Sequence, residues 1–237
     1  TKNDTKEIKI INYITFPPNL TEIGENSFEN FKTLKSIYFP SKLNKIGKMS
    51  FKGCSELSKI NLSRSNLTSI SMGCFVACKK LTEITFPNPK TDFKILDIAF
   101  AQCTNLPEIN LPDNLIELGG YSFVGCTKLT KIYLNYRVIE KLKEKGDNYI
   151  WKAFDNCPNL KNVIIRCNDF ITTDEIKKIE SLFTINTILH SSTGPTLHTH
   201  KPIITYIDCK TKTVSTKIPS TVSAQIRKTV CDLPFIL

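Results

Sequence analysis

The chain of 237 residues has few of the residues on which catalysis, metal binding and membrane insertion commonly depend. It has three histidines, one tryptophan and two methionines, and no apolar run approaches the ~18 residues that span a bilayer. It also has no glycine-rich loop that would hold a phosphate and no serine in a strained strand-to-helix turn. We therefore expect no membrane span in this stretch of chain, no cofactor and no enzymatic activity.

The few histidines lie near the C-terminal end. His198 and His200 would place both rings on one side of a strand, where two metal ligands could stand. No acidic or cysteine partner stands at a supporting spacing, and His190 lies apart from the pair. The sequence therefore predicts no metal site.

What the chain has instead is an internal repeat marked by six phenylalanines. A small residue precedes each one, a leucine follows six residues later, and an apolar-x-apolar triplet stands three residues further on. The spacings between the phenylalanines are 23, 24, 25, 23 and 31 residues. A repeat of ~20–29 residues with one short strand is typical of a leucine-rich solenoid. The marked residues are Phe28, Phe51, Phe75, Phe100, Phe123 and Phe154.

Apolar residues alternate with period two in each triplet, which predicts one short strand in each repeat. A single repeat cannot bury its own apolar edge, so successive turns must stack into a continuous core, phenylalanine on phenylalanine. A partial copy at 14–16 adds a seventh strand near the N-terminal end. Gly24, Gly47 and Gly119 follow an apolar residue in the second half of the turn, where we expect a backbone angle that a Cβ would resist.

Nine cysteines suggest disulfide bonds, but five of them share one repeat position, where the first full repeat has Phe31. A position that accepts Phe or Cys is an apolar slot, because free cysteine behaves as a small buried hydrophobe. Neighbouring thiols would come near disulfide range with parallel side chains, so we expect a reduced column. Cys74 takes the place of the small residue before the phenylalanine, while Cys167, Cys209 and Cys231 could supply one disulfide in a secreted protein. The column consists of Cys54, Cys78, Cys103, Cys126 and Cys157.

The pattern L-x-x-I-x-L/F-P-x-x-L-x-x-I-G-x-x-S/A-F-x-x-C resembles the BspA-like, or Treponema-type, leucine-rich repeats. The resemblance covers residues 1–167 and implies a right-handed, curved solenoid that is rich in β-structure and has short helical or 3-10 turns. It also implies a role in protein contact, usually adhesion or matrix binding at the surface of bacteria and protozoan parasites. It implies no catalytic residues.

We divide the chain into a leucine-rich repeat array at 1–167, with six to seven repeats, and a small α+β cap at 168–237. An N-cap, an acidic first turn and helical apolar spacing predict a helix at 173–183. Short strands are expected at 187–190, 202–209 and 213–218, around a polar loop at 192–195. The cap, or a set of degenerate turns, would shield the open end of the core.

An insertion at 135–150 lengthens the last spacing between phenylalanines. Val138, Ile139 and Leu142 have the spacing of a helix, so we expect a short protruding helix. Insertions in repeat arrays often carry contacts, and this one together with Trp151 is the most distinctive candidate for partner specificity. The alternative is a tolerated loop without a role.

The residues between the buried positions of each strand must point outward, which gives two rows on the concave face. These rows offer tyrosines, hydrogen-bonding side chains and charges of both signs, a composition compatible with a protein partner. A solvated strand face would have the same composition. The candidate partner-binding residues are Tyr13, Tyr38, Lys59, Glu83, Glu108, Lys131, Tyr133 and Trp151.

The formal net charge of +10 raises the hypothesis of a polyanionic partner. The lysine clusters lack interleaved aromatic residues, so we do not expect nucleic-acid binding. They are either a solvated face or a site of weak binding to acidic glycans or an anionic surface, which salt would weaken. The clusters are Lys42, Lys45, Lys48 and Lys52, and Lys141, Lys143 and Lys145.

The leading hypothesis from the sequence is a non-catalytic interaction solenoid, secreted or exposed on the cell surface, that binds a host or matrix protein in adhesion. The alternative is an intracellular scaffold or substrate-recognition module in the cytoplasm. The resemblance favours the first, and the oxidation state of the C-terminal cysteines would separate the two.

Overall fold

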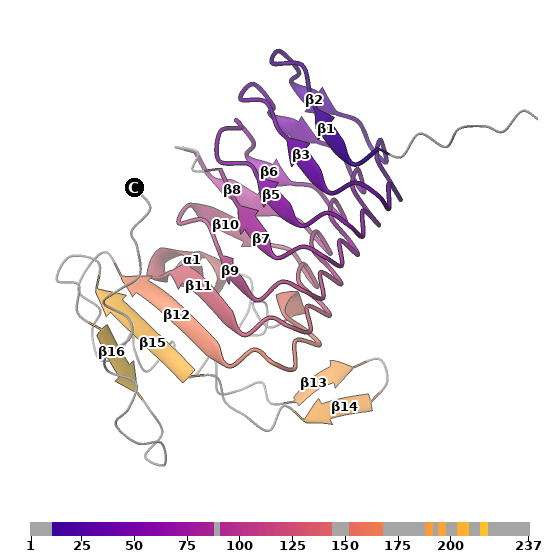
Figure 1. Ribbon diagram of the computed structural model, residues 1–237. Coiled ribbons are helices and arrows are strands. Elements are labelled where there is room, and N and C mark those ends of the chain that lie inside the picture. Colours follow the sequence, from indigo (N-terminus) through magenta and orange to yellow (C-terminus); the bar gives the residue numbers. More distant parts are fainter. Residues whose placement is uncertain are drawn as a thin grey trace, which may run out of the picture.

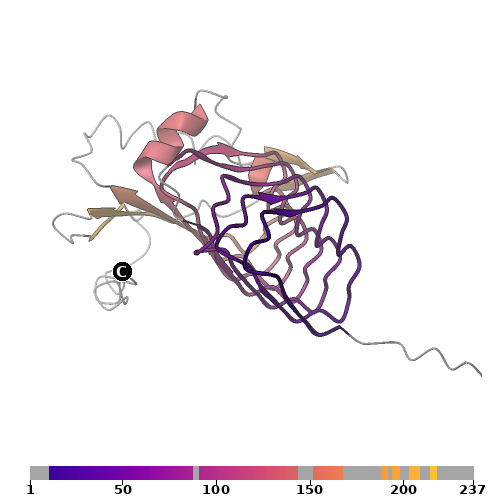
Figure 2. The same cartoon turned by 90° about the horizontal axis from the view of Figure 1, so that it is seen from above.

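The computed structural model describes residues 11–87, 91–143, 152–167, 188–191, 194–197, 203–208 and 214–217. Its described residues form a solenoid in which the chain repeats one turn along an axis, as the sequence repeat predicts (Figure 1). The view from above shows the outlines of successive turns lying over one another (Figure 2). The predicted solenoid is confirmed.

Short parallel strands, one from each turn, lie side by side along one face, which we call the strand face (Figure 1). The pairs keep a one-to-one register, so that Ile14 lies opposite Ile37 and Ile60 opposite Ile84. From the second turn onward the first residue of the predicted apolar-x-apolar triplet is buried, as period-two alternation requires. The strands are β1 (Tyr13–Thr15), β3 (Ser36–Tyr38), β5 (Lys59–Asn61), β7 (Glu83–Thr85), β9 (Glu108–Asn110), β11 (Lys131–Asn135) and β12 (Asn162–Cys167).

A second ladder of shorter strands runs along another side of the turns. Its members also pair in parallel, and each buries an isoleucine or leucine such as Ile46 or Leu118. They are β2 (Glu22–Ile23), β4 (Lys45–Ile46), β6 (Ser69–Ile70), β8 (Phe93–Ile95) and β10 (Leu115–Leu118).

The third side of each turn carries the repeated phenylalanine, and we call it the Phe corner. Consecutive rings stack with centroids 5.2–5.4 Å apart and interplanar angles of 4–10°. The N–H of each of the first five phenylalanines donates to the carbonyl of the small residue in the next turn, as from Phe75 to Ala99 at 2.8 Å. The corners are residues 26–30, 49–53, 73–77, 98–102, 121–125 and 152–156.

Left-handed backbone lies at the ends of these corners. The residue two positions after the phenylalanine has positive φ in all six corners, and the residue two positions before it has positive φ in the first five. Gly53 and Gly125 suit this conformation, whereas Ala77 (φ 57°) and Ile98 (φ 51°) adopt it against the steric preference of a Cβ. The corner is therefore a tight turn whose backbone is the same whichever residue occupies it.

The glycines singled out in the sequence have a different reason for their identity. Gly24, Gly47 and Gly119 do not have positive φ, so the expected special backbone angle is wrong. A Cβ at Gly47 would lie 2.5 Å from the backbone nitrogen of Glu25, and one at Gly119 would lie 2.3 Å from that of Asp97. Two of these positions are glycine because the preceding turn passes too close for a side chain.

The cysteine column is buried and reduced, as predicted. Each thiol donates to the carbonyl of the phenylalanine one turn earlier, at 3.2–3.4 Å between Sγ and O. Burial raises the pKa of Cys54 and that of Cys103 to about 12. The hydrogen bond with Cys157, and after it burial, raises the pKa of Cys126. Cys74 is also free and buried.

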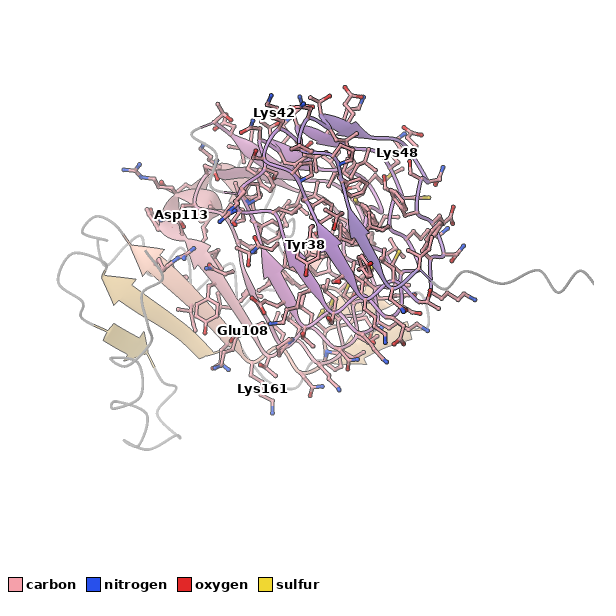
Figure 3. The ribbon with its side chains drawn as sticks, turned by 45° about the horizontal axis from the view of Figure 1, so that its top comes forward. Tyr38, Lys42, Lys48, Glu108, Asp113 and Lys161 are labelled. Atoms are coloured by element: carbon pink, nitrogen blue, oxygen red, sulfur yellow. The ribbon has the colours of Figure 1, made fainter. Side chains whose placement is uncertain are left out.

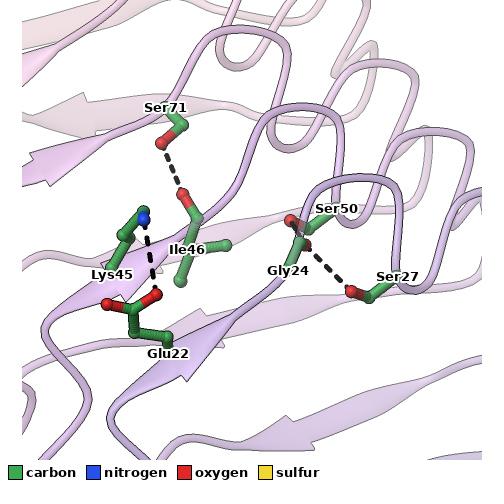
Figure 4. A network of polar contacts seen from close by, with 7 residues as sticks. All are labelled: Glu22, Gly24, Ser27, Lys45, Ile46, Ser50 and Ser71. Carbon is green, nitrogen blue, oxygen red and sulfur yellow. Dashed lines mark hydrogen bonds and ion pairs between the residues drawn. The ribbon is translucent and has the colours of Figure 1, made fainter.

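Hydroxyl groups join the turns on the side of the short strands (Figure 4). Ser50 Oγ lies 2.8 Å from the carbonyl of Gly24 in the preceding turn and 2.6 Å from that of Gly47 in its own. Ser71 donates in the same way to the carbonyl of Ile46. Because backbone carbonyls accept these bonds, the small polar residues fix the stacking distance between turns.

The insertion forms α1 (Tyr136–Lys143), which begins at an N-cap made by Asn135, whose Oδ1 accepts from the N–H of Arg137 at 3.0 Å. The helix is present as predicted, but its expected protrusion is wrong. Val138, Ile139 and Leu142 are buried, and the helix packs against β10 and β11 (Figure 1). The insertion thus continues the core where the next short strand would otherwise stand.

Strands of the tail continue the strand face and form a separate hairpin. β15 (Ile203–Asp208) pairs with β12 in parallel, and β16 (Val214–Lys217) pairs with β15 in antiparallel orientation. β13 (Ile188–Ser191) and β14 (Gly194–Leu197) form the hairpin, so the end of the predicted loop at 192–195 is strand instead. Several predictions for the tail lie outside the described residues. They concern the helix at 173–183, His198, His200, Cys209, Cys231 and the side chain of Cys167.

Candidate interaction face

The strand face presents the two outward rows that the sequence predicts. The register places Lys59 opposite Glu83 and Glu108 opposite Lys131, while Asn110 lies opposite Tyr133. Figure 3 shows Tyr38 and Glu108 over the strands of this face. Because every turn repeats the same backbone, side chains from residues far apart in sequence form a continuous surface.

Two tyrosines stand at the N-terminal end of the face. Tyr13 is 69% exposed and Tyr38 is 63% exposed, although each is large and apolar enough to be buried in a core. The register puts Tyr13 beside Ser36 and Tyr38 beside Thr15, so the two rings are diagonal neighbours. Ile11, which precedes β1, is 41% exposed and was not expected on this surface.

The middle of the face is neutralised by its own charges. Lys59 Nζ lies 2.7 Å from Glu83 Oε2 across β5 and β7. Both side chains are well exposed, so this ion pair contributes at most ~1 kcal/mol to stability. These two candidate residues therefore satisfy each other, an outcome that follows from their predicted adjacency.

Tyr133 and Glu108 form a third group toward the C-terminal end. The Tyr133 Oη lies 3.5 Å from Glu108 Oε2, and Tyr133 is half-buried. Burial, and after it the nearby negative charge of Glu108, raises the pKa of the Tyr133 hydroxyl. Lys131 stands beside Glu108 on the same face.

The sequence also singled out Trp151 and two lysine clusters, which are not part of the strand face. Trp151 lies outside the described residues, as do the side chains of Lys143 and Lys145. The cluster at 42–52 is divided among partners, since Lys45 pairs with Glu22 at 3.3 Å and Lys52 pairs with Glu29 at 2.9 Å. Half of this cluster is therefore neutralised by carboxylates of the preceding turn, while Lys42 donates to the amide oxygen of Asn19 at 3.0 Å.

Within the described ranges, no three His, Cys, Asp or Glu side chains gather in a way that could hold a metal ion. None of the helices in that part of the chain has both the length and the apolar character needed to cross a bilayer.

Solved structures place this architecture among leucine-rich repeat proteins. A leucine-rich repeat protein from Bacteroides ovatus is 31% identical with a TM-score of 0.53, over 65% of this chain and 37% of that one. The leucine-rich repeat protein of T. pallidum is 20% identical with a TM-score of 0.54, over 73% of this chain and 84% of that one, and shares the fold. This chain therefore spans only about a third of the length of the Bacteroides protein.

No curated protein sequence matches the chain. The family described as the BspA type leucine-rich repeat region matches with six copies, at residues 6–95 and 89–196. These ranges include every Phe corner and all strands of the strand face. The chain belongs to the BspA-type leucine-rich repeat family.

Proposed function

We propose that the chain is an adhesion module, exposed on the cell surface or secreted, that binds a protein of a host or matrix through its strand face. The family supports a protein-interaction module, and the adhesive role is our extension of it. The observation that carries the proposal is the pair of exposed tyrosines, Tyr13 and Tyr38, on a rigid ladder. Tyrosine is enriched among the residues that dominate protein interfaces, because it brings a large apolar ring and a hydroxyl at low entropic cost.

The remaining face residues have supporting roles in this proposal. Glu108, Lys131 and Tyr133 offer charge and hydrogen bonds at the other end of the face. The Lys59–Glu83 pair would lie between the two ends of the face. It would align the partner along the face more than it would strengthen binding, because the two charges already neutralise each other. We further propose that the tail continues this face as a cap, since β15 extends it by one strand.

The test compares exposed tyrosines of the strand face with an exposed tyrosine elsewhere. The double variant Tyr13→Ala/Tyr38→Ala should weaken binding of the purified chain to immobilised collagen, laminin or fibronectin by at least about tenfold. Tyr121→Ala is the matched control, because Tyr121 is 46% exposed but lies in a Phe corner. Antibody labelling of intact source cells tests the location in parallel.

Equal weakening by the control would remove the strand face from the proposal. Binding to none of the three matrix proteins, together with labelling only after permeabilisation, would overturn the adhesive role and favour an intracellular scaffold. Thermal unfolding of each variant verifies that the fold is retained.

A further inference from the structure

One edge of the solenoid is strongly basic. The segments that lead into the long strands carry six lysines, and Glu56 is the one acidic residue among them. All six lysines are exposed, and we call this surface the lysine edge. The segments are 32–35, 55–58, 79–82, 104–107, 127–130 and 158–161, and the lysines are Lys32, Lys35, Lys79, Lys80, Lys128 and Lys161.

The lysine edge holds six lysines against a single carboxylate, so its positive charge is largely uncompensated. Lys80 pairs with Glu56 at 2.7 Å, whereas the described part of the chain offers the other five no ion pair. Elsewhere several cations are matched from turn to turn, as in Lys45–Glu22, Lys52–Glu29 and Lys94–Glu117. The lysine edge has six lysines and one carboxylate, and Figure 3 shows Lys161 of this edge on another side of the array than Lys42 and Lys48.

The lysine edge is built on a regular backbone. Backbone N–H groups link its segments in sequence, from Ser58 to Lys35 at 3.3 Å, from Thr82 to Ser58 at 2.8 Å and from Lys161 to Thr130 at 3.1 Å. Strands that pair in this way lie ~4.8 Å apart, so segments on alternate turns recur at about 10 Å. The lysines therefore form a band that runs along the stacked turns.

Hydroxyl and amide groups fill the turns between the lysines. Thr82 Oγ1 donates to the carbonyl of Ser58 at 3.1 Å, and Thr130 Oγ1 donates to that of Pro107 at 3.0 Å. Their rotamers are thus fixed, and their oxygens keep a free acceptor lone pair. The segments contain no aromatic residue, and their leucines are buried except for Leu160, which is partly buried.

We propose that the lysine edge binds a linear sulfated polysaccharide lying along the solenoid axis. Sulfates on such a chain would pair with the lysine ammonium groups, and sugar hydroxyls would donate to the fixed threonine oxygens. A single-stranded nucleic acid would lack aromatic side chains on which to stack, and a membrane or folded protein would lack an exposed apolar anchor. This site is separate from the strand face and does not depend on the function proposed for that face.

The test uses two charge-reversal variants with the same net charge. Lys79→Glu/Lys128→Glu changes the lysine edge, and Lys42→Glu/Lys48→Glu changes exposed lysines on another side. The probe is heparin, with desulfated heparin, anionic phospholipid vesicles and poly-uridine RNA as separate arms. We expect the dissociation constant for heparin to rise about tenfold or more in the edge variant and less than about threefold in the control. Binding by the unaltered chain should weaken steeply with salt.

Equal weakening by the two variants would overturn the proposal, because net charge alone would then account for binding. Desulfated heparin that binds as tightly as heparin would also overturn it, as would tighter binding of vesicles or RNA that is lost in the edge variant. Matrix-protein binding of the same edge variant should be unchanged, which separates this proposal from that for the strand face.

Discussion

The Phe corner and the strand face of each turn follow opposite rules. At the corner, every turn repeats the same stacked ring and the same left-handed residue two positions after the phenylalanine, and every turn after the first repeats the same thiol-to-carbonyl bond. On the face, the outward residues change from tyrosine to ion pair to amide between turns. Because the corner fixes the backbone, the face is free to vary without altering the stack. The corner thus carries the stability of the stack, and the face is the part that we propose for recognition.

The largest expected effect comes from comparing the stability of two variants, one with a side chain truncated in the Phe corner and one with a side chain truncated on the strand face. Phe75→Ala should lower the free energy of unfolding by ~3–5 kcal/mol, because a fully buried ring stacked between Phe51 and Phe100 is lost. Tyr38→Ala should change it by less than ~0.5 kcal/mol, since the ring is largely exposed. Urea unfolding of both variants measures the difference. A comparable loss in the two would show that the face also carries the fold.

The thiol column makes the stability of the Phe corner depend on alkaline pH. Cys103 has a folded pKa of about 12 against an ordinary value of 9.0, so above pH 9 the unfolded chain loses a proton that the folded chain keeps. Its contribution is complete below pH 9 and declines toward pH 12, by ~1.4 kcal/mol for each pH unit. Unfolding of the unaltered chain and of Cys103→Ala at pH 8, 9 and 10 should give a shallower decline in the variant. Identical slopes would contradict the assigned role of burial.

The smallest expected effect on stability comes from the backbone conformation of the Phe corner rather than from its packing. Ala77→Gly should stabilise the chain by ~0.5–1 kcal/mol, because Ala77 has a φ of 57° and the equivalent position in two other turns is already glycine. The matched control is Ala101→Gly, a nearby alanine without positive φ, which should destabilise by a similar amount. Melting temperatures measure both, and a loss in Ala77→Gly would refute the strain assigned to this position.

Sequence periodicity was enough to predict what is repeated. The alternation around Ile37 and its equivalents predicted the strands, and the shared position of the cysteines predicted a buried, reduced column. The two outward rows also followed, because a one-to-one register between identical turns leaves few alternatives.

Features that depend on the distance between turns could not be predicted in this way. The identity of Gly47 reflects how closely Glu25 approaches it, a contact between turns that spacing alone does not reveal. Helical spacing in 136–143 predicted α1 but not the surface that it covers, because Val138 and Leu142 could equally have faced a partner. The uncompensated charge of the lysine edge was not predicted either. Ion pairs such as Lys80–Glu56 and Lys52–Glu29 join neighbouring turns, and spacing along the chain does not show whether two side chains reach each other.

Placement of α1 has a consequence for how such an array can change its length. Turns before Asn135 are interchangeable units, so duplicating one in the gene would insert a rung without disturbing its neighbours. α1 occupies the position of a short strand beside β10 and therefore ends that ladder. A turn duplicated across this point would meet a helix where it needs a strand edge, so growth of the array in evolution is confined to the side before the helix.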